Sequence, residues 1–166
     1  MMGKNIFVSL CLFSATSVIT FAQEKRWLFG TGITSCNYID NPGLNVNVTY
    51  RLTGNLHIGP DFSALLNKEI SENGKVTKKK ELEYNFNAQY LFEIRKKLSL
   101  YPLAGINLSR VTFHTEDEMP DKRWITALNL GGGFEYRLEK FRLFVESKYV
   151  TQLNKVDVTT GIILEL

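Results

Sequence analysis

Apolar and polar residues alternate with a period of two over most of the chain beyond residue 25, which is the pattern of β-strands with two different faces. In the segment 44–51 the even-numbered positions are apolar and the odd-numbered positions are polar. The segment 82–92 repeats this arrangement, with leucine, alanine and aromatic residues at even positions. No segment beyond the N-terminal region has a helical period, so the pattern predicts an all-β domain.

The alternation and its interruptions predict eight antiparallel strands. We place them at residues 26–37, 43–51, 55–65, 81–93, 98–112, 123–137, 140–150 and 156–166. Short breaks at 52–55, 94–97 and 138–139 alternate with longer, more polar connections around 38–42, 66–80, 113–122 and 151–155. Short turns at one end and long loops at the other are typical of an eight-stranded antiparallel up-and-down transmembrane β-barrel, which is the fold that we expect.

The polar face indicates what surrounds the barrel. A soluble ligand-binding barrel such as a lipocalin would alternate equally well, but its water-exposed face should be rich in lysine and glutamate. Here the strand midsections carry amides and threonine instead, at Asn45, Asn47, Thr49, Asn85, Asn87, Gln89, Asn107 and Asn129. These side chains suit a narrow, hydrogen-bonded lumen, so we expect the apolar face to contact lipid. A soluble β-barrel or β-sandwich is the competing fold.

Charged residues of both signs also fall on the expected lumen face. They are Arg51, Asp61, Glu83, Glu135, Arg142, Glu146, Lys148 and Asp157. Buried charges persist only when they are paired and hydrogen-bonded. Because an eight-stranded barrel has just enough room for its interior side chains, we expect a structural ion-pair network that plugs the lumen, with glycines inside the strands relieving the crowding. A path for ions through the same network is the alternative.

Aromatic residues on the apolar face fall toward the strand ends. Such residues form girdles at the two membrane–water interfaces of transmembrane barrels. The girdle positions that we expect are Trp27, Tyr50, Tyr84, Phe92, Trp124, Tyr136, Phe141 and Tyr149.

The N-terminal region has the pattern of a secretory signal. Lys4 precedes an apolar stretch over 6–22, and the small residues Thr20 and Ala22 precede a polar group that begins at Gln23. We expect cleavage after Ala22, leaving a mature barrel domain over 23–166. A permanent membrane anchor is the alternative, but the stretch is short for a span and diluted with hydroxyl residues.

Little in the sequence points to chemistry. Cys36 is the only cysteine after residue 22, so no intramolecular disulfide is expected, and the net charge of +3 with no basic stripe gives no support for nucleic-acid binding. Two histidines and one cysteine do not supply a metal coordination set, and no cofactor motif occurs. His57 is expected to be a satisfied lumen residue. His114 with Ser109 is the one pairing that would suit a lipid-modifying enzyme, and we expect no catalytic site.

Taken together, the signal, the eight two-faced strands, the alternating connections and the apolar-faced terminal strand 156–166 resemble the small outer-membrane barrels. The likeness is to OmpA- and OmpX-like barrels and to the PorT-like group known as the outer membrane protein beta-barrel domain. It implies a location in the outer membrane of a Gram-negative cell, contact with outer-membrane lipid, and recognition of the terminal strand by the barrel-assembly machinery. The last residue is Leu166, where the usual insertion signal has phenylalanine.

The leading functional hypothesis is a monomeric, non-enzymatic outer-membrane barrel with a structural or surface-recognition role. Its loops 66–80 and 113–122 would be the contact surface, for a partner that the sequence does not identify. A narrow pore for small solutes is the first alternative. A lipid-A-modifying enzyme is the second.

Overall fold

A computed structural model describes residues 26–37, 39–72, 75–115 and 119–165, with side chains described outside 39–41, 66–72 and 75–76. The expected signal peptide over 1–22 and the last residue, Leu166, lie outside the described residues. Within the described part of the chain, no helix has the length and apolarity needed to cross a membrane.

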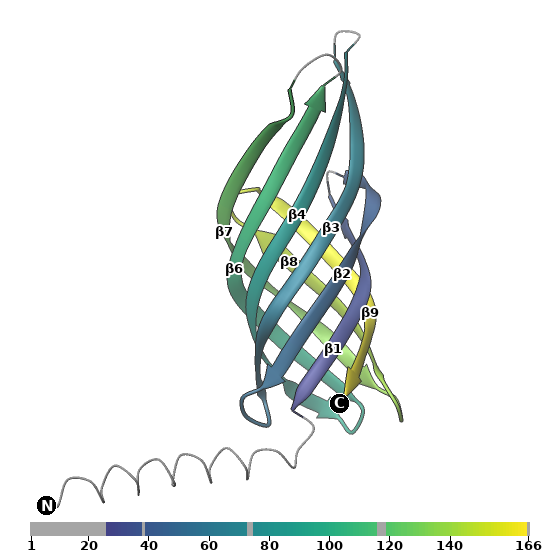
Figure 1. Cartoon of the computed structure of the whole chain (residues 1–166). Coiled ribbons are helices and arrows are strands. Elements are labelled where there is room, and N and C mark those ends of the chain that lie inside the picture. The colour runs from purple at the N-terminus through teal and green to yellow at the C-terminus, as the bar shows by residue number, and fades with distance from the viewer. Residues whose placement is uncertain (1–25, 38, 73–74, 116–118, 166) are drawn as a thin grey trace, which may run out of the picture.

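The described residues form nine strand segments in one antiparallel sheet that closes on itself (Figure 1). The segments are β1 (Trp27–Cys36), β2 (Ile39–Arg51), β3 (Leu56–Glu72), β4 (Lys75–Tyr90), β5 (Phe92–Arg95), β6 (Leu98–Thr115), β7 (Asp121–Arg137), β8 (Arg142–Val150) and β9 (Lys155–Glu165). The barrel closes because β9 pairs with β1, from Leu28 with Glu165 to Cys36 with Asp157. Through the body of the barrel each strand therefore has a neighbour on both sides, which is what a lipid environment requires.

The segments β4 and β5 are one strand interrupted at Leu91, so the barrel has the eight strands that the sequence predicts. Both pair with β6, and the pairs Gln89 with Leu103 and Phe92 with Leu100 keep the same register across the break. Pro102 lies in β6 opposite the break and has no N–H to donate to the ladder. Asn55 supplies a donor at the break instead, because its side-chain Nδ2 donates to the Leu91 carbonyl at 3.0 Å. The Asn55 carbonyl also accepts from the Leu91 N–H at 2.8 Å.

Turns at the two ends of the barrel differ from each other. The three short connections at 52–55, 96–97 and 138–141 agree with the expected tight turns, and we call this the short-turn end. At the opposite end, the hairpin end, the expected long loops at 66–80 and 38–42 are wrong, because β3 runs to Glu72, β4 begins at Lys75 and β2 begins at Ile39. Charged side chains made these segments look like loops, yet an antiparallel ladder satisfies the backbone whatever the side chains are.

The rim at the hairpin end is slanted. The segments β3, β4, β6 and β7 have 17, 16, 18 and 17 residues, whereas β1, β8 and β9 have 10, 9 and 11. Figure 1 shows the β3–β4 and β6–β7 hairpins reaching far beyond the connections of β1 to β2 and β8 to β9. We call β3, β4, β6 and β7 the tall wall, and β1, β2, β8 and β9 the short wall.

Hydrophobic side chains cover the outside of the barrel and polar ones fill its interior. Phe86, Ile106 and Leu128 are register partners on β4, β6 and β7, and they are 54%, 58% and 55% exposed. The neighbouring pair Asn85 and Asn107 points inward and is buried. This arrangement is the reverse of a water-soluble protein and is that of a barrel whose outer face contacts lipid.

Candidate functional site

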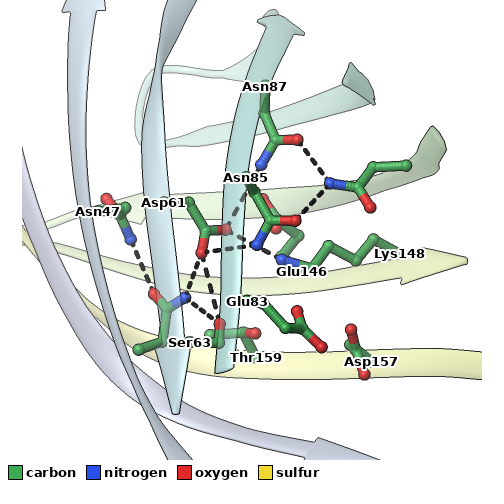
Figure 2. Close-up of polar contacts among 12 residues, drawn as sticks. Asn47, Asp61, Ser63, Glu83, Asn85, Asn87, Glu146, Lys148, Asp157 and Thr159 are labelled. Atoms are coloured by element: carbon green, nitrogen blue, oxygen red, sulfur yellow. Dashed lines mark hydrogen bonds and ion pairs between the residues drawn. The ribbon is translucent and has the colours of Figure 1, made fainter. Parts of the chain in front are cut away.

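Asp61 is the centre of a hydrogen-bond network in the middle of the lumen (Figure 2). Its carboxylate accepts from Asn45 Nδ2 at 2.8 Å and from Lys148 Nζ at 3.0 Å, which come from β2 and β8. Weaker bonds of 3.3 Å and 3.4 Å come from the amides of Asn85 and Asn87 on β4. One aspartate therefore joins strands from both walls of the barrel.

Asparagine amides extend this network across β4, β6 and β7. Asn85 Oδ1 accepts from Asn107 Nδ2 at 2.7 Å and from Asn129 Nδ2 at 2.8 Å. Asn129 Nδ2 also donates to Asn87 Oδ1 at 3.0 Å (Figure 2). An amide suits this role because it both donates and accepts, so each residue passes the network on to the next strand.

From Asp61 toward the short-turn end, two clusters of buried hydrophobic side chains line the lumen, and together we call them the hydrophobic layer. One consists of Leu28, Phe144 and Ile163, and the other of Leu91, Tyr101 and Leu103. The Tyr101 hydroxyl is 3.2 Å from Glu146 Oε2 and donates to it, and Gln89 Nε2 donates to the same oxygen at 3.1 Å. Gly133 makes room for the tyrosine, because a Cβ there would lie 2.6 Å from the Tyr101 hydroxyl oxygen.

Lys155 is surrounded by carboxylates on the hairpin-end side of the lumen, in a group that we call the lysine cluster: Lys155, Glu81, Glu83 and Asp157. Its Nζ lies 2.9 Å from Glu81 Oε1 and 3.3 Å from Asp157 Oδ1, and it also contacts Glu83 Oε1. All four side chains are 0% exposed. Lys79 Nζ is 3.5 Å from the second oxygen of Glu81.

Two arginines pair with two glutamates at the short-turn end, in a group that we call the arginine cluster: Arg51, Arg142, Glu135 and Glu165. Arg142 donates to Glu135 Oε2 at 2.8 Å and also binds Glu165 Oε1. The same Glu165 oxygen is 2.5 Å from the Arg51 guanidinium. Glu165 is therefore shared between cations from β2 and β8, and it lies on β9 between them.

The eight charged residues expected in the lumen all lie on the inner face, seven of them buried and Arg51 half-buried. The structure brings Asp61 to Lys148, Glu135 to Arg142 and Asp157 to the lysine cluster. Sequence reasoning missed Lys155 and Glu81, because it assigned Lys155 to a loop and gave Glu81 no role. Their parity was the available signal, since both share the odd numbering of the inward residues on their strands.

The expected girdle residues lie on the outer face. Six are exposed, and Tyr50 and Phe141 are half-buried. Trp27 packs against Tyr50 with ring centroids 4.9 Å apart, toward the short-turn end. Nearer the hairpin end, the ring centroids of Tyr84 on β4 and Trp124 on β7 are 6.1 Å apart.

The structure separates the candidate catalytic pair. Ser109 is fully buried and donates to Asn107 Oδ1 at 2.8 Å, whereas His114 is exposed. The two residues differ in parity on β6 and so point to opposite faces of the barrel wall. The described residues contain no group of three or more His, Cys, Asp or Glu side chains that could hold a metal ion.

The environment of His57 differs from the one that the sequence predicts. His57 lies in the lumen near the short-turn end, as expected, but it is not satisfied: neither ring nitrogen has a hydrogen-bond partner among the described residues. It borders a cavity of about 670 Å³ at the short-turn end. The middle of the lumen, in contrast, retains a cavity of about 20 Å³ beside Asp61 and Glu146, which is close to the room that one water needs.

Comparisons with known proteins agree with this inside-out barrel. The family model described as "Outer membrane protein beta-barrel domain" matches residues 8–162. A comparison with curated proteins gives no match.

Solved structures of small outer-membrane barrels share the fold. Ail, the attachment invasion locus protein of Yersinia pestis, is 17% identical, with 84% of this chain and 95% of that chain covered and a TM-score of 0.57. A second structure of Ail, 18% identical with coverage of 84% and 95% and a TM-score of 0.57, contains the heparin analogue sucrose octasulfate. Neisserial surface protein A is 15% identical, with coverage of 86% and 98% and a TM-score of 0.64.

At identities this low, the solved structures support the fold alone. The family model supports membership of the family, because it matches most of the sequence. The closed antiparallel barrel, its apolar outer face and its polar lumen agree with both. The chain belongs to the outer membrane protein β-barrel domain family and is an outer-membrane β-barrel protein.

Proposed function

We propose that this protein is a non-enzymatic, closed scaffold whose tall wall is a recognition surface for an anionic partner outside the cell. The observation that carries the proposal is the slanted rim, in which the β3–β4 and β6–β7 hairpins extend past the short wall (Figure 1). In barrels of this class the short turns face the periplasm, so these hairpins project from the cell surface. The loops 66–80 and 113–122 of the sequence hypothesis fall on them.

Basic residues on the outward face of these hairpins support an anionic partner. Lys80 and Lys122 are both exposed and flank Thr112 in register, and the exposed Lys78 pairs with His114. Below them, the Arg110 guanidinium lies 5.8 Å from the centre of the Trp124 ring. The fold neighbour Ail has been crystallised with a highly sulfated sugar, and a sulfated polysaccharide is the partner class that we propose here.

The binding test uses the folded protein in lipid nanodiscs, with heparin on a biosensor surface as the probe. Changing Lys80→Gln and Lys122→Gln together should weaken binding about tenfold, and binding should fall steeply with salt. The matched control is Lys96→Gln with Lys97→Gln, which removes the same charge at the short-turn end. Equal affinities for both double variants, or no binding by the original protein, would refute the recognition role.

The filled lumen supports the scaffold over the narrow pore. The hydrophobic layer, the Asp61 network and the lysine cluster succeed one another along the lumen, and each is buried. We expect no steady conductance from the protein in planar bilayers. Steady unitary currents would favour the pore instead, and loss of a lipid A modification on His114→Ala would favour the enzyme.

We also propose that β9 is the segment that the barrel-assembly machinery engages. Apart from Thr160, its outward residues are apolar: Val156, Val158, Ile162 and Leu164 are exposed. Replacing Val158 and Ile162 by serine should lower the amount of folded protein in the outer membrane while leaving the secreted chain detectable. Unchanged outer-membrane levels would count against this role.

A further inference from the structure

His57 is a buried polar side chain without a partner. It lies on β3, is 1% exposed, and borders the cavity of about 670 Å³ at the short-turn end. Neither Nδ1 nor Nε2 makes a hydrogen bond to the described residues. Buried polar groups in proteins are nearly always hydrogen-bonded, so an imidazole placed at the edge of a cavity calls for a ligand from that cavity.

The described lining of this cavity is basic on balance. Four arginines border it, at Arg26, Arg51, Arg137 and Arg142, against one acidic residue, Glu93. Arg142 and Arg51 are already paired with the acids of the arginine cluster, Glu135 and Glu165, so the remaining basic charge of the lining is on Arg26 and Arg137. The lining also provides neutral donors at Thr53, Asn55 and Ser99.

The arginines, His57 and the neutral donors of the lining together determine which charge and shape of ligand fit the cavity. Guanidinium groups present planar pairs of N–H donors that match the oxygens of a carboxylate or a phosphate. A cation would be repelled by the same groups. The cavity volume lies in the range of sites for small molecules, and the cavity opens at the short-turn end, so a small anion can reach His57 from the periplasm.

We propose that the periplasmic mouth of the barrel is a binding site for a small oxyanion, a carboxylate or a phosphate, held by His57 and the surrounding arginines. His57 donates one ring N–H to the anion, while Arg137 adds charge at the entrance. The site lies at the opposite end of the molecule from the tall wall and does not depend on the proposed recognition of a surface partner.

The test uses the folded protein in micelles, with inorganic phosphate and succinate as separate probes. Isothermal titration calorimetry should give saturable binding of at least one of them. His57→Leu and Arg137→Gln should each weaken it about tenfold, by removing a ligand or a charge. Arg95→Gln is the matched control, because Arg95 also lies near the short-turn end and does not line the cavity.

A second measurement needs no variant. In histidine-labelled protein, the anion that binds should shift the ring resonances of His57 and leave those of the exposed His114 unchanged. A stronger response to succinate identifies a carboxylate ligand, and a stronger response to phosphate identifies a phosphate ligand. The proposal is overturned if neither anion binds saturably, if both histidines respond alike, or if Arg95→Gln weakens binding as much as Arg137→Gln does.

Discussion

The lysine cluster and the arginine cluster both place charged side chains in the lumen, but they differ in how the charges are paired and in how well they are shielded from solvent. In the lysine cluster three carboxylates face the Lys155 ammonium, and every side chain is inaccessible to solvent. In the arginine cluster two arginines divide two glutamates between them beside an open cavity. A lysine is a compact point charge and an arginine is a rigid planar fork. The three carboxylates of the first cluster therefore share one central cation, with Lys79 also near Glu81, whereas the second cluster has two arginines for its two glutamates.

The largest effect is expected from removing the central cation of the buried lysine cluster. Lys155→Met leaves Glu81, Glu83 and Asp157 buried without their shared cation, and it should lower the free energy of unfolding by about 3–5 kcal/mol. Urea unfolding of the barrel in micelles, followed by its heat-modifiable gel mobility, measures the loss.

The control for this variant is Lys80→Met, an exposed lysine on the tall wall, which should be close to neutral. Adding Glu81→Gln and Glu83→Gln to Lys155→Met should recover part of the loss. If Lys155→Met unfolds at the same urea concentration as the original protein, the cluster does not stabilise the barrel.

A smaller effect is expected in the arginine cluster. Arg142→Met removes the ion pair to Glu135 but leaves Glu165 bound to Arg51, next to a cavity that water can enter. We expect a loss of about 2 kcal/mol in the same unfolding experiment. Arg137→Met, the exposed neighbour, serves as the control. A loss as large as that of Lys155→Met would remove the contrast between the two clusters.

The hydrophobic layer between the clusters can be tested at Gly133. A methyl group there would collide with the Tyr101 hydroxyl and the Val145 carbonyl, so Gly133→Ala should cost about 1–2 kcal/mol. The Tyr101 ring carbon Cζ would also lie 2.7 Å from the new methyl group, so combining Gly133→Ala with Tyr101→Leu, which lacks the ring, removes the collision with this side chain. Stability closer to that of Tyr101→Leu alone is then expected in urea, and full additivity of the two losses would show that the ring and the glycine are independent.

The smallest effect is expected from an ion pair in water. Arg123 Nη2 and Asp121 Oδ2 are 2.8 Å apart, and both side chains are mostly exposed on the tall wall. Asp121→Asn should change the free energy of unfolding by no more than about 0.5 kcal/mol. A loss comparable to that of Arg142→Met would mean that burial is not what separates the two clusters from surface pairs.

The period-two pattern was sufficient for the fold and for most of the lumen. Parity along a strand fixes which residues share a face, so Asp61, Glu146 and Lys148 could be placed inside from the sequence. The pattern did not reveal where the strands end. The lysine-rich segment before residue 81 resembled a loop, and this concealed both the tall wall and the role of Glu81.

The partners of the lumen residues could not be predicted either, because they depend on contacts across the barrel. Lys155 and Glu81 are 74 positions apart in the chain, and the closure of the sheet brings their side chains together. The unpartnered state of His57 is set in the same way, by the absence of a facing acceptor or donor among the described residues of the opposite strands. Local sequence patterns carry no information on such distances.

Because of the slanted rim, the two sides of the barrel differ in height. A barrel with a level rim looks alike from every direction in the plane of the membrane, and a neighbour could approach it from any side. Here the β3–β4 and β6–β7 hairpins rise on one side, while the opposite side stays low (Figure 1). In the orientation proposed above, a large particle that touches the cell surface meets this taller side of the protein first. The rotation of the barrel about the membrane normal then decides whether the particle reaches the hairpins.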